Sequence, residues 1–234
     1  MLNGYALHKE LVWVLAIVLP ILFCLIHYLF FGPHSTEKQK NDSFDLVRRF
    51  NTREKIFHWL GLVVFLIMAF TGAAQIFGEE GTSDVGPFHG NLGILLVIVA
   101  FLLLISWVKY ALFKGYDKRW LLSIGGYLSK ESTPLPAGRF NAGQKIYFWL
   151  ITTSIIALGV TAVLMEQGGR GPHSLIETQS FYWSLHGLIG CFALAMVIGH
   201  AYLSLFANPQ TARVLRDGKV SREYVKKHHS KWNY

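Results

Sequence analysis

Residues Ser180–Ala207 read SFYWSLHGLIGCFALAMVIGHAYLSLFA, a run of 28 residues without Asp, Glu, Lys or Arg. A helix needs about 20 apolar residues to cross the hydrocarbon core of a bilayer, so this run is long enough to do so. Two histidines, His186 and His200, lie inside it. The run therefore predicts a transmembrane helix that carries two ionisable side chains.

Four other segments are equally apolar and are 20 or more residues long. The whole chain of 234 residues is 52% apolar and 15% charged, whereas soluble domains contain about 25% charged residues. No stretch between the segments exceeds 40 residues, which excludes a soluble enzyme domain. The sequence predicts an all-α integral membrane protein, a four-helix bundle with one extra N-terminal transmembrane helix. The four segments are Leu11–Phe31, Ile56–Gly78, Pro87–Val108 and Ile146–Met165.

The basic residues alternate between the two sides of this predicted bundle. In chain order the six connecting segments contain 1, 6, 0, 7, 1 and 7 Lys and Arg residues. Cytoplasmic loops carry an excess of Lys and Arg, so the pattern places the N-terminus outside and the C-terminus in the cytoplasm. The net charge of +8 therefore reflects membrane topology and not a nucleic-acid partner. The first apolar segment exceeds the roughly 7–15 residues of a signal peptide core, and we expect it to stay as a membrane helix.

Four histidines fall at two predicted depths. His186 and His200 are 14 residues apart, which places them on one helix face and about 21 Å apart along the axis. With the predicted topology, His186 lies near the outer surface and His200 near the inner one. His89 begins the third segment after an acidic outer loop, Glu79–Asp84, and His58 begins the second segment after a basic inner loop. We therefore pair His89 with His186 outside and His58 with His200 inside.

Two imidazoles from different helices at one depth are what a six-coordinate haem b requires. The pairing predicts two transmembrane haems b, with Gly93, Gly190 and Gly61 close to the ligands to admit the porphyrin. A lone intramembrane histidine is also explained by a helix-to-helix hydrogen bond, worth about 0.6 kcal/mol, and glycine by close helix packing. His27, in the first segment, has no counterpart, and we interpret it as such a helix contact.

Two motifs resemble a known family, the gamma or cytochrome b subunits of membrane-bound formate dehydrogenases. The first is RFNAGQK at 139–145, followed by Phe148-Trp149, and the second is GKVSR at 218–222, followed by KKHH at 226–229 and Trp232. The resemblance extends from about Arg53 to the C-terminus. Cytochrome b subunits of nickel–iron hydrogenases and thiosulfate reductases are related and stay open as alternatives.

The resemblance implies a complex of the bacterial inner membrane that assembles into a higher oligomer. In that family an iron–sulfur beta subunit and a molybdenum or tungsten catalytic alpha subunit lie outside the cytoplasm. Electrons cross two haems b and reduce menaquinone or another quinone near the cytoplasmic face. The formate-oxidising site is expected in the partner, because the short loops of this chain cannot house it.

The resemblance also implies that Asn141 and Gly143 line the quinone pocket beside His200. Asn141 and Gln144 have the N-cap and N3 spacing of a capping box, which explains the asparagine without a ligand. Both roles are compatible, since a helix N-terminus offers backbone donors to a quinone carbonyl.

Three regions are expected along the chain. Residues 1–50 form the extra helix and a basic cytoplasmic loop, for which the family has no match. Residues 51–208 form the bundle, and residues 209–234 form a cytoplasmic tail, expected as a helix along the membrane surface. A short amphipathic piece is expected around Lys118–Leu122 in the inner loop. A non-enzymatic membrane anchor and a metal transporter are alternatives from other functional classes.

Overall fold

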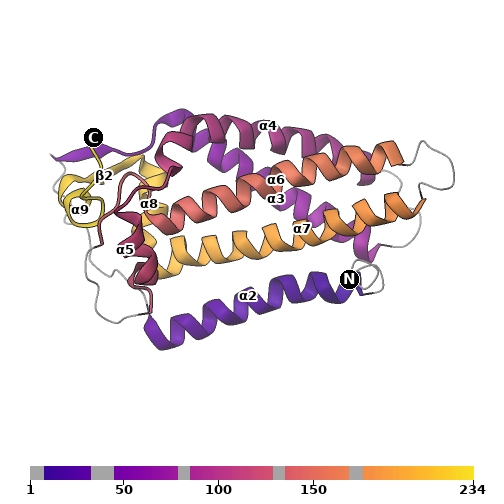
Figure 1. Ribbon diagram of the computed structural model, residues 1–234, viewed down its shortest axis with the longest axis horizontal. Helices are drawn as coiled ribbons and strands as arrows, with labels where there is room; N and C mark the ends of the chain where they lie inside the picture. Colours follow the sequence, from indigo (N-terminus) through magenta and orange to yellow (C-terminus); the bar gives the residue numbers. More distant parts are fainter. Residues whose placement is uncertain (1–7, 33–44, 79–84, 129–134, 169–175) are drawn as a thin grey trace. The chain divides into compact units, whose positions relative to one another are not determined.

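A computed structural model describes residues 8–32, 45–78, 85–128, 135–168 and 176–234. The acidic loop Glu79–Asp84 lies outside these residues. Figure 1 shows a chain built mainly of long helices. The described residues contain five helices long and apolar enough to cross a membrane, as predicted. They are α2 (Lys9–Phe31), α3 (Thr52–Phe77), α4 (Val85–Ala111), α6 (Ala142–Gly168) and α7 (Ile176–Tyr202).

These helices are apolar around their whole circumference. Large hydrophobic side chains are left exposed, including Phe23 (69%), Leu29 (72%) and Phe70 (76%). A helix that is apolar all round requires an apolar surrounding, which here is the bilayer. The protein is thus an all-α, multi-pass membrane protein.

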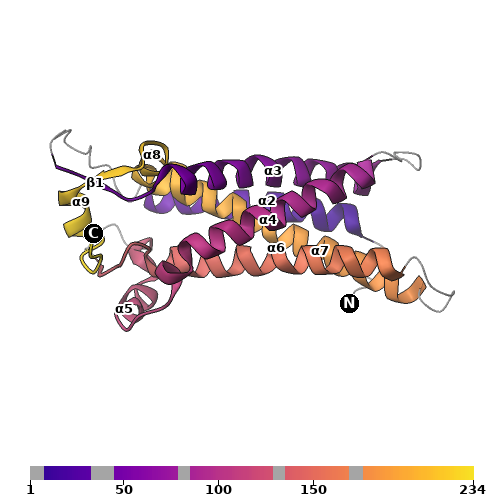
Figure 2. The ribbon, with the colours of Figure 1, turned by 90° about the horizontal axis from the view of Figure 1, so that it is seen from above.

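The chain divides into two compact units, each described on its own. The first unit comprises Met1–Ile21, His58–Leu102 and Ile151–Ile198. In this unit α3, α4, α6 and α7 pack side by side, as Figures 1 and 2 show. Their shared core consists of Val64, Phe65, Leu96, Ala100, Ile155 and Ala193.

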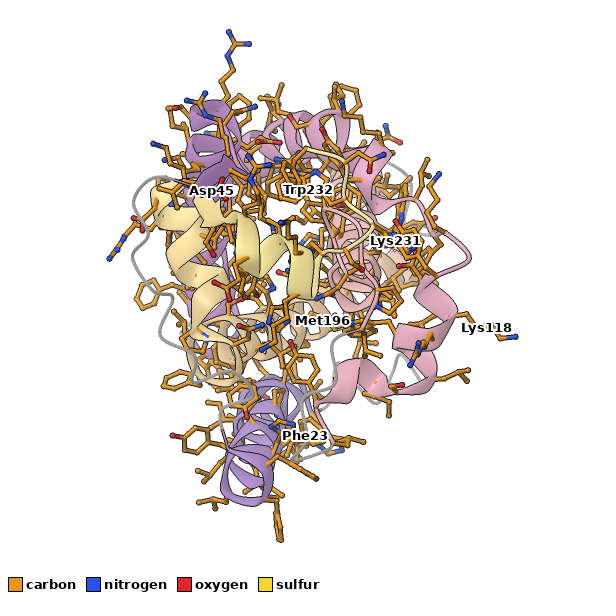
Figure 3. The ribbon with its side chains drawn as sticks, turned by 90° about the vertical axis from the view of Figure 1, so that its left-hand side faces the viewer. Phe23, Asp45, Lys118, Met196, Lys231 and Trp232 are labelled. Carbon is orange, nitrogen blue, oxygen red and sulfur yellow. The ribbon has the colours of Figure 1, made fainter. Side chains whose placement is uncertain are left out.

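The second unit comprises Leu22–Phe57, Leu103–Leu150 and Gly199–Tyr234. It contains the short elements β1 (Leu46–Arg48), α5 (Asp117–Leu122), η1 (Ile124–Gly126), η3 (Leu203–Ala207), α8 (Pro209–Asp217), β2 (Lys219–Ser221) and α9 (Arg222–His228). Helix α5 occupies the predicted amphipathic piece, and Figure 3 shows its Lys118 side chain pointing away from the ribbon.

The C-terminal tail differs from the single surface helix that we expected. Gly218 has φ +75° and ends α8, because a left-handed residue stops the helix. Strand β2 then pairs antiparallel with β1, with Val47 opposite Val220. Val214, Val220 and Val225 are buried in a core with Phe50 and Phe140 of the same unit. The tail is therefore a packed part of the second unit.

Candidate functional site

The structure brings two of the predicted histidines together. His89 of α4 and His186 of α7 both belong to the first unit. Their ring centroids are 6.3 Å apart, and the ring planes are inclined by 64°. Both side chains are half-buried. Two imidazoles from different helices thus lie close together at one level of the bundle.

Each of these histidines is held by a threonine from a neighbouring helix. His89 Nδ1 lies 2.7 Å from Thr71 Oγ1 of α3, and His186 Nδ1 lies 2.9 Å from Thr161 Oγ1 of α6. Sequence reasoning missed both threonines. A threonine in an apolar helix satisfies its hydroxyl on its own backbone, so it gives no separate signal of a histidine partner.

The glycines near the histidines divide into two groups. A Cβ added at Gly190 would meet no heavy atom within 4 Å, so the α7 surface one turn from His186 faces open space. Added Cβ atoms at Gly61 and Gly93 would lie 3.3 Å from Val99 and 3.5 Å from Met68. Those two glycines support close packing of α3 and α4, which was the alternative explanation for them.

The other two histidines belong to different units, and their pairing stays a prediction. His58 lies near the start of α3, with its ring centroid 5.7 Å from that of Trp59. His200 is stacked on Tyr147 of α6, with centroids 4.1 Å apart and planes within 8°. Tyr147 is thus an aromatic neighbour of His200 that the sequence motif did not reveal.

The predicted capping box at the start of α6 is present. Gln144 N donates to Asn141 Oδ1 at 2.9 Å, and Asn141 N donates to Gln144 Oε1 at 3.1 Å. A Cβ at Gly143 would collide with the indole ring of Trp120, and the same holds at Gly125. Gly143 therefore provides the surface on which the side chain of Trp120 rests.

Charged residues are buried behind this helix start. Glu54 accepts from Arg139 Nη2 at 2.8 Å and from Trp107 Nε1 at 2.8 Å, and both partners of the ion pair are less than 10% exposed. Arg49 donates to Arg139 O at 2.8 Å and to Gln144 Oε1 at 3.3 Å. Burial lowers the pKa of Arg49 to about 10, so the guanidinium stays charged at neutral pH. This network ties the chain before α3 to the start of α6.

A second buried ion pair lies beside it. Lys145 Nζ is 2.7 Å from Asp117 Oδ2, and the two side chains are 1% and 2% exposed. Asp117 Oδ2 also accepts from the Lys114 backbone N–H at 2.7 Å, which fixes the start of α5. The RFNAGQK motif therefore carries two structural ion pairs as well as the capping box.

His27 makes helix contacts, as expected. Its Nε2 lies 2.9 Å from the Tyr127 carbonyl oxygen, and its Nδ1 lies 2.6 Å from the Tyr202 hydroxyl. Since a carbonyl only accepts, Nε2 carries the proton and Nδ1 accepts from the Tyr202 O–H. His27 thus attaches the extra helix α2 to α7 within the second unit.

A bundle of transmembrane helices with paired internal histidines defines a class of multi-pass, haem-binding membrane proteins. The chain belongs to the prokaryotic cytochrome b561 family, whose sequence model matches residues 49–217. Membership of a cytochrome b family implies haem b as the cofactor. Helix α2 precedes the matched region, in agreement with its absence from the expected family core.

Similarity to individual proteins supports the resemblance found in the motifs. The chain is 26% identical to the cytochrome b556(Fdn) subunit of the nitrate-inducible formate dehydrogenase of Escherichia coli K12, over 75% of this chain and 84% of that subunit. It is 24% identical to the formate dehydrogenase cytochrome b556 subunit of Haemophilus influenzae, over 79% and 81% of the two chains. The chain is also 24% identical to the cytochrome b556(fdo) subunit of E. coli K12, over 80% of this chain and 92% of that subunit. The predicted resemblance to the cytochrome b subunits of formate dehydrogenases is confirmed.

Proposed function

We propose that this chain is the dihaem cytochrome b subunit of a formate dehydrogenase complex of the bacterial inner membrane. It would accept electrons from an iron–sulfur partner and deliver them to menaquinone or another quinone. The relatives named above support the partner, and the alternation of basic loops supports a periplasmic N-terminus and a cytoplasmic C-terminus.

The proximity of the His89 and His186 rings is the observation that carries this proposal. A metal ion held by two histidines would lie about 2.0–2.1 Å from one nitrogen of each ring, so the two rings must lie on opposite sides of it and several ångströms apart. The two ring centroids are 6.3 Å apart. The open space beside Gly190 is consistent with room for a porphyrin. The residues present therefore fit a haem b, which His89 and His186 would hold.

Each residue has a defined task in this proposal. His89 and His186 would hold the outer haem, and His58 and His200 the inner one. A bound haem supplies a one-electron iron couple between the ferric and ferrous states. Asn141 would donate its side-chain N–H to a quinone carbonyl at the start of α6. Gly143 would add a backbone N–H there, where the positive end of the helix dipole favours a carbonyl oxygen.

A redox difference spectrum of the purified complex, with haem quantification, tests the proposal. We expect b-type bands and two haems per chain, reduced by formate when the catalytic partner is present. His89→Ala and His186→Ala should each remove the outer haem, while the inner haem remains. Absence of b-type bands would overturn the proposal and favour a non-enzymatic anchor. Equal loss of both haems in folded variants would overturn the pairing.

A further inference from the structure

We propose that Thr71 and Thr161 are positioning residues that fix the tautomer and the electron-donating strength of His89 and His186. This inference rests on the proposed function, because it concerns the haem that these histidines would hold. It goes beyond that function by assigning a task to two side chains outside the predicted ligand set.

The threonine hydroxyl hydrogens are already committed to the backbone. Thr71 Oγ1 donates to the carbonyl oxygen of Ile67 at 2.9 Å, and Thr161 Oγ1 donates to that of Ala157 at 2.9 Å. A hydroxyl has one hydrogen and two lone pairs, so each oxygen can only accept from the histidine beside it. The bonds at 2.7 and 2.9 Å therefore run from Nδ1–H of the histidine to Oγ1 of the threonine.

The tautomer follows from this direction. In a neutral imidazole one nitrogen carries the hydrogen and the other a lone pair. With the hydrogen on Nδ1, the lone pairs of His89 and His186 are on Nε2, where each can bind a metal ion. Histidines that ligate metals usually donate their other N–H to a protein acceptor, which fixes the ring and raises the ligand's basicity.

Burial and stereochemistry hold both threonines in place. Thr71 and Thr161 are only 7% and 4% exposed, so water does not compete for the Nδ1–H groups. A β-branched side chain has few χ1 rotamers in a helix, and the bond to the preceding turn selects one of them. The rotamer thus points a fixed acceptor at each histidine.

The arrangement occurs twice, in two separate helical hairpins. In the first, Thr71 is on α3 and His89 on α4, and in the second, Thr161 is on α6 and His186 on α7. Both threonines also lie within 3.2 Å of a second carbonyl of their own helix. A repeated threonine–histidine pair on both sides of one proposed haem points to a shared requirement of that haem.

A change in the haem potential is the expected consequence of losing either bond. An imidazole whose Nδ1–H is hydrogen-bonded donates more electron density to iron, which stabilises the ferric state. Valine has the shape of threonine but lacks the hydroxyl, so it removes the side-chain acceptor of Nδ1–H. Thr71→Val and Thr161→Val should therefore shift the potential of the outer haem to higher values, and the double variant should shift it further.

Spectroelectrochemical titration of the purified complex, with haem quantification, tests this inference. Thr71→Ser and Thr161→Ser keep the hydroxyl and should restore the potential. Thr152→Val is a matched control, because Thr152 is a buried threonine of α6 in the same unit. Thr152→Val should leave the potential of the outer haem unchanged. None of these variants should change the potential of the inner haem. The His89→Ala protein identifies which potential belongs to the outer haem.

Each outcome decides between the proposals. Unchanged potentials in fully haem-loaded valine variants would overturn the positioning role, and so would an equal shift in Thr152→Val. If a valine variant loses the outer haem, a serine variant that keeps this haem supports the positioning role. Loss of the outer haem in both the valine and the serine variant contradicts it. A wild-type complex without b-type bands would instead overturn the proposed function itself.

Discussion

At Asn141 two roles fall on different atoms of one side chain. The capping box uses Oδ1 as acceptor for the Gln144 N–H, and it does not need the Nδ2 hydrogens. A quinone carbonyl, in contrast, requires a donor. The capping role, which the structure shows, and the proposed quinone contact can therefore be separated by substitution.

Asn141→Asp is the variant that separates them. Aspartate is as good an N-cap as asparagine, so thermal stability should stay close to that of the wild type. The donor is lost, and we expect slower quinone reduction while both haems are still reduced by formate. Asn141→Ala should show the same slow turnover and also lose about 1 kcal/mol of stability. Haem re-oxidation by a quinone analogue, measured beside thermal unfolding, checks this. Normal re-oxidation in Asn141→Asp would remove the quinone assignment and leave the cap.

At the scale of elements, the docked C-terminal tail has a pH-sensitive contact. His229 Nδ1–H donates to the Gly138 carbonyl oxygen at 2.6 Å, and the side chain is 3% exposed. Burial and the nearby Arg49 guanidinium hold the pKa of His229 well below 6.5. The folded tail thus contains a neutral histidine.

Stability of the second unit should therefore fall in mild acid. Above about pH 6.5 His229 is neutral in both states and contributes no pH dependence. Below that pH the detached tail binds a proton that the docked tail cannot bind, so the free energy of unfolding drops by up to about 1.4 kcal/mol per pH unit. Limited proteolysis of the tail at pH 7.5 and 5.5 measures the effect. His229→Gln should flatten the difference, and an unchanged pH response in that variant would contradict the assignment.

Helix α2 is attached through His27 and should be dispensable for haem. None of the four proposed ligands lies in α2, and its bonds to Tyr202 and Tyr127 are each worth about 0.5–1.5 kcal/mol. Deleting residues 1–34 should therefore lower thermal stability modestly and leave two haems per chain. Tyr202→Phe in the full chain is the matched control for the loss of one bond. Haem loss in a deletion variant that still inserts would show a role for α2 in the site.

For the whole molecule, the sequence predicted the membrane spans, which hydropathy determines, and the capping box at the start of α6. The five spans agree with the structure to within a few residues at most ends, because membrane burial leaves a continuous apolar signal. The Asn141–Gln144 box was predicted because its two partners are three residues apart. The pairing of β1 with β2 was not, since three-residue strands 173 positions apart leave no local pattern.

The same limit applies to contacts between side chains of different helices. Thr161 has a partner on its own helix, so its bond to His186 adds nothing visible in the sequence. Gly143 was expected to line a pocket, and only the structure shows Trp120 resting on it. Helix positions can be derived from composition along the chain, whereas these contacts depend on how the helices pack.

The proposed membrane orientation leads to a prediction about energy conversion. Reducing one quinone takes up two electrons and two protons. If formate is oxidised outside and Asn141, Gly143 and His200 lie near the cytoplasmic face, as proposed, electrons would arrive from outside and protons from the cytoplasm. Turnover would then separate charge across the membrane without a proton pump, because the electrons alone cross the bilayer.

Proteoliposomes containing the complex and a quinone test this orientation. In vesicles that expose only the formate site outward, a trapped pH indicator should report alkalinisation of the lumen, at about two protons per formate oxidised. A protonophore should abolish the pH change and leave formate oxidation running. Asn141→Asp should slow the alkalinisation in proportion to quinone reduction, since both depend on one site. Proton uptake from the outer medium at a normal rate of quinone reduction would place the quinone pocket on the opposite face and overturn the orientation.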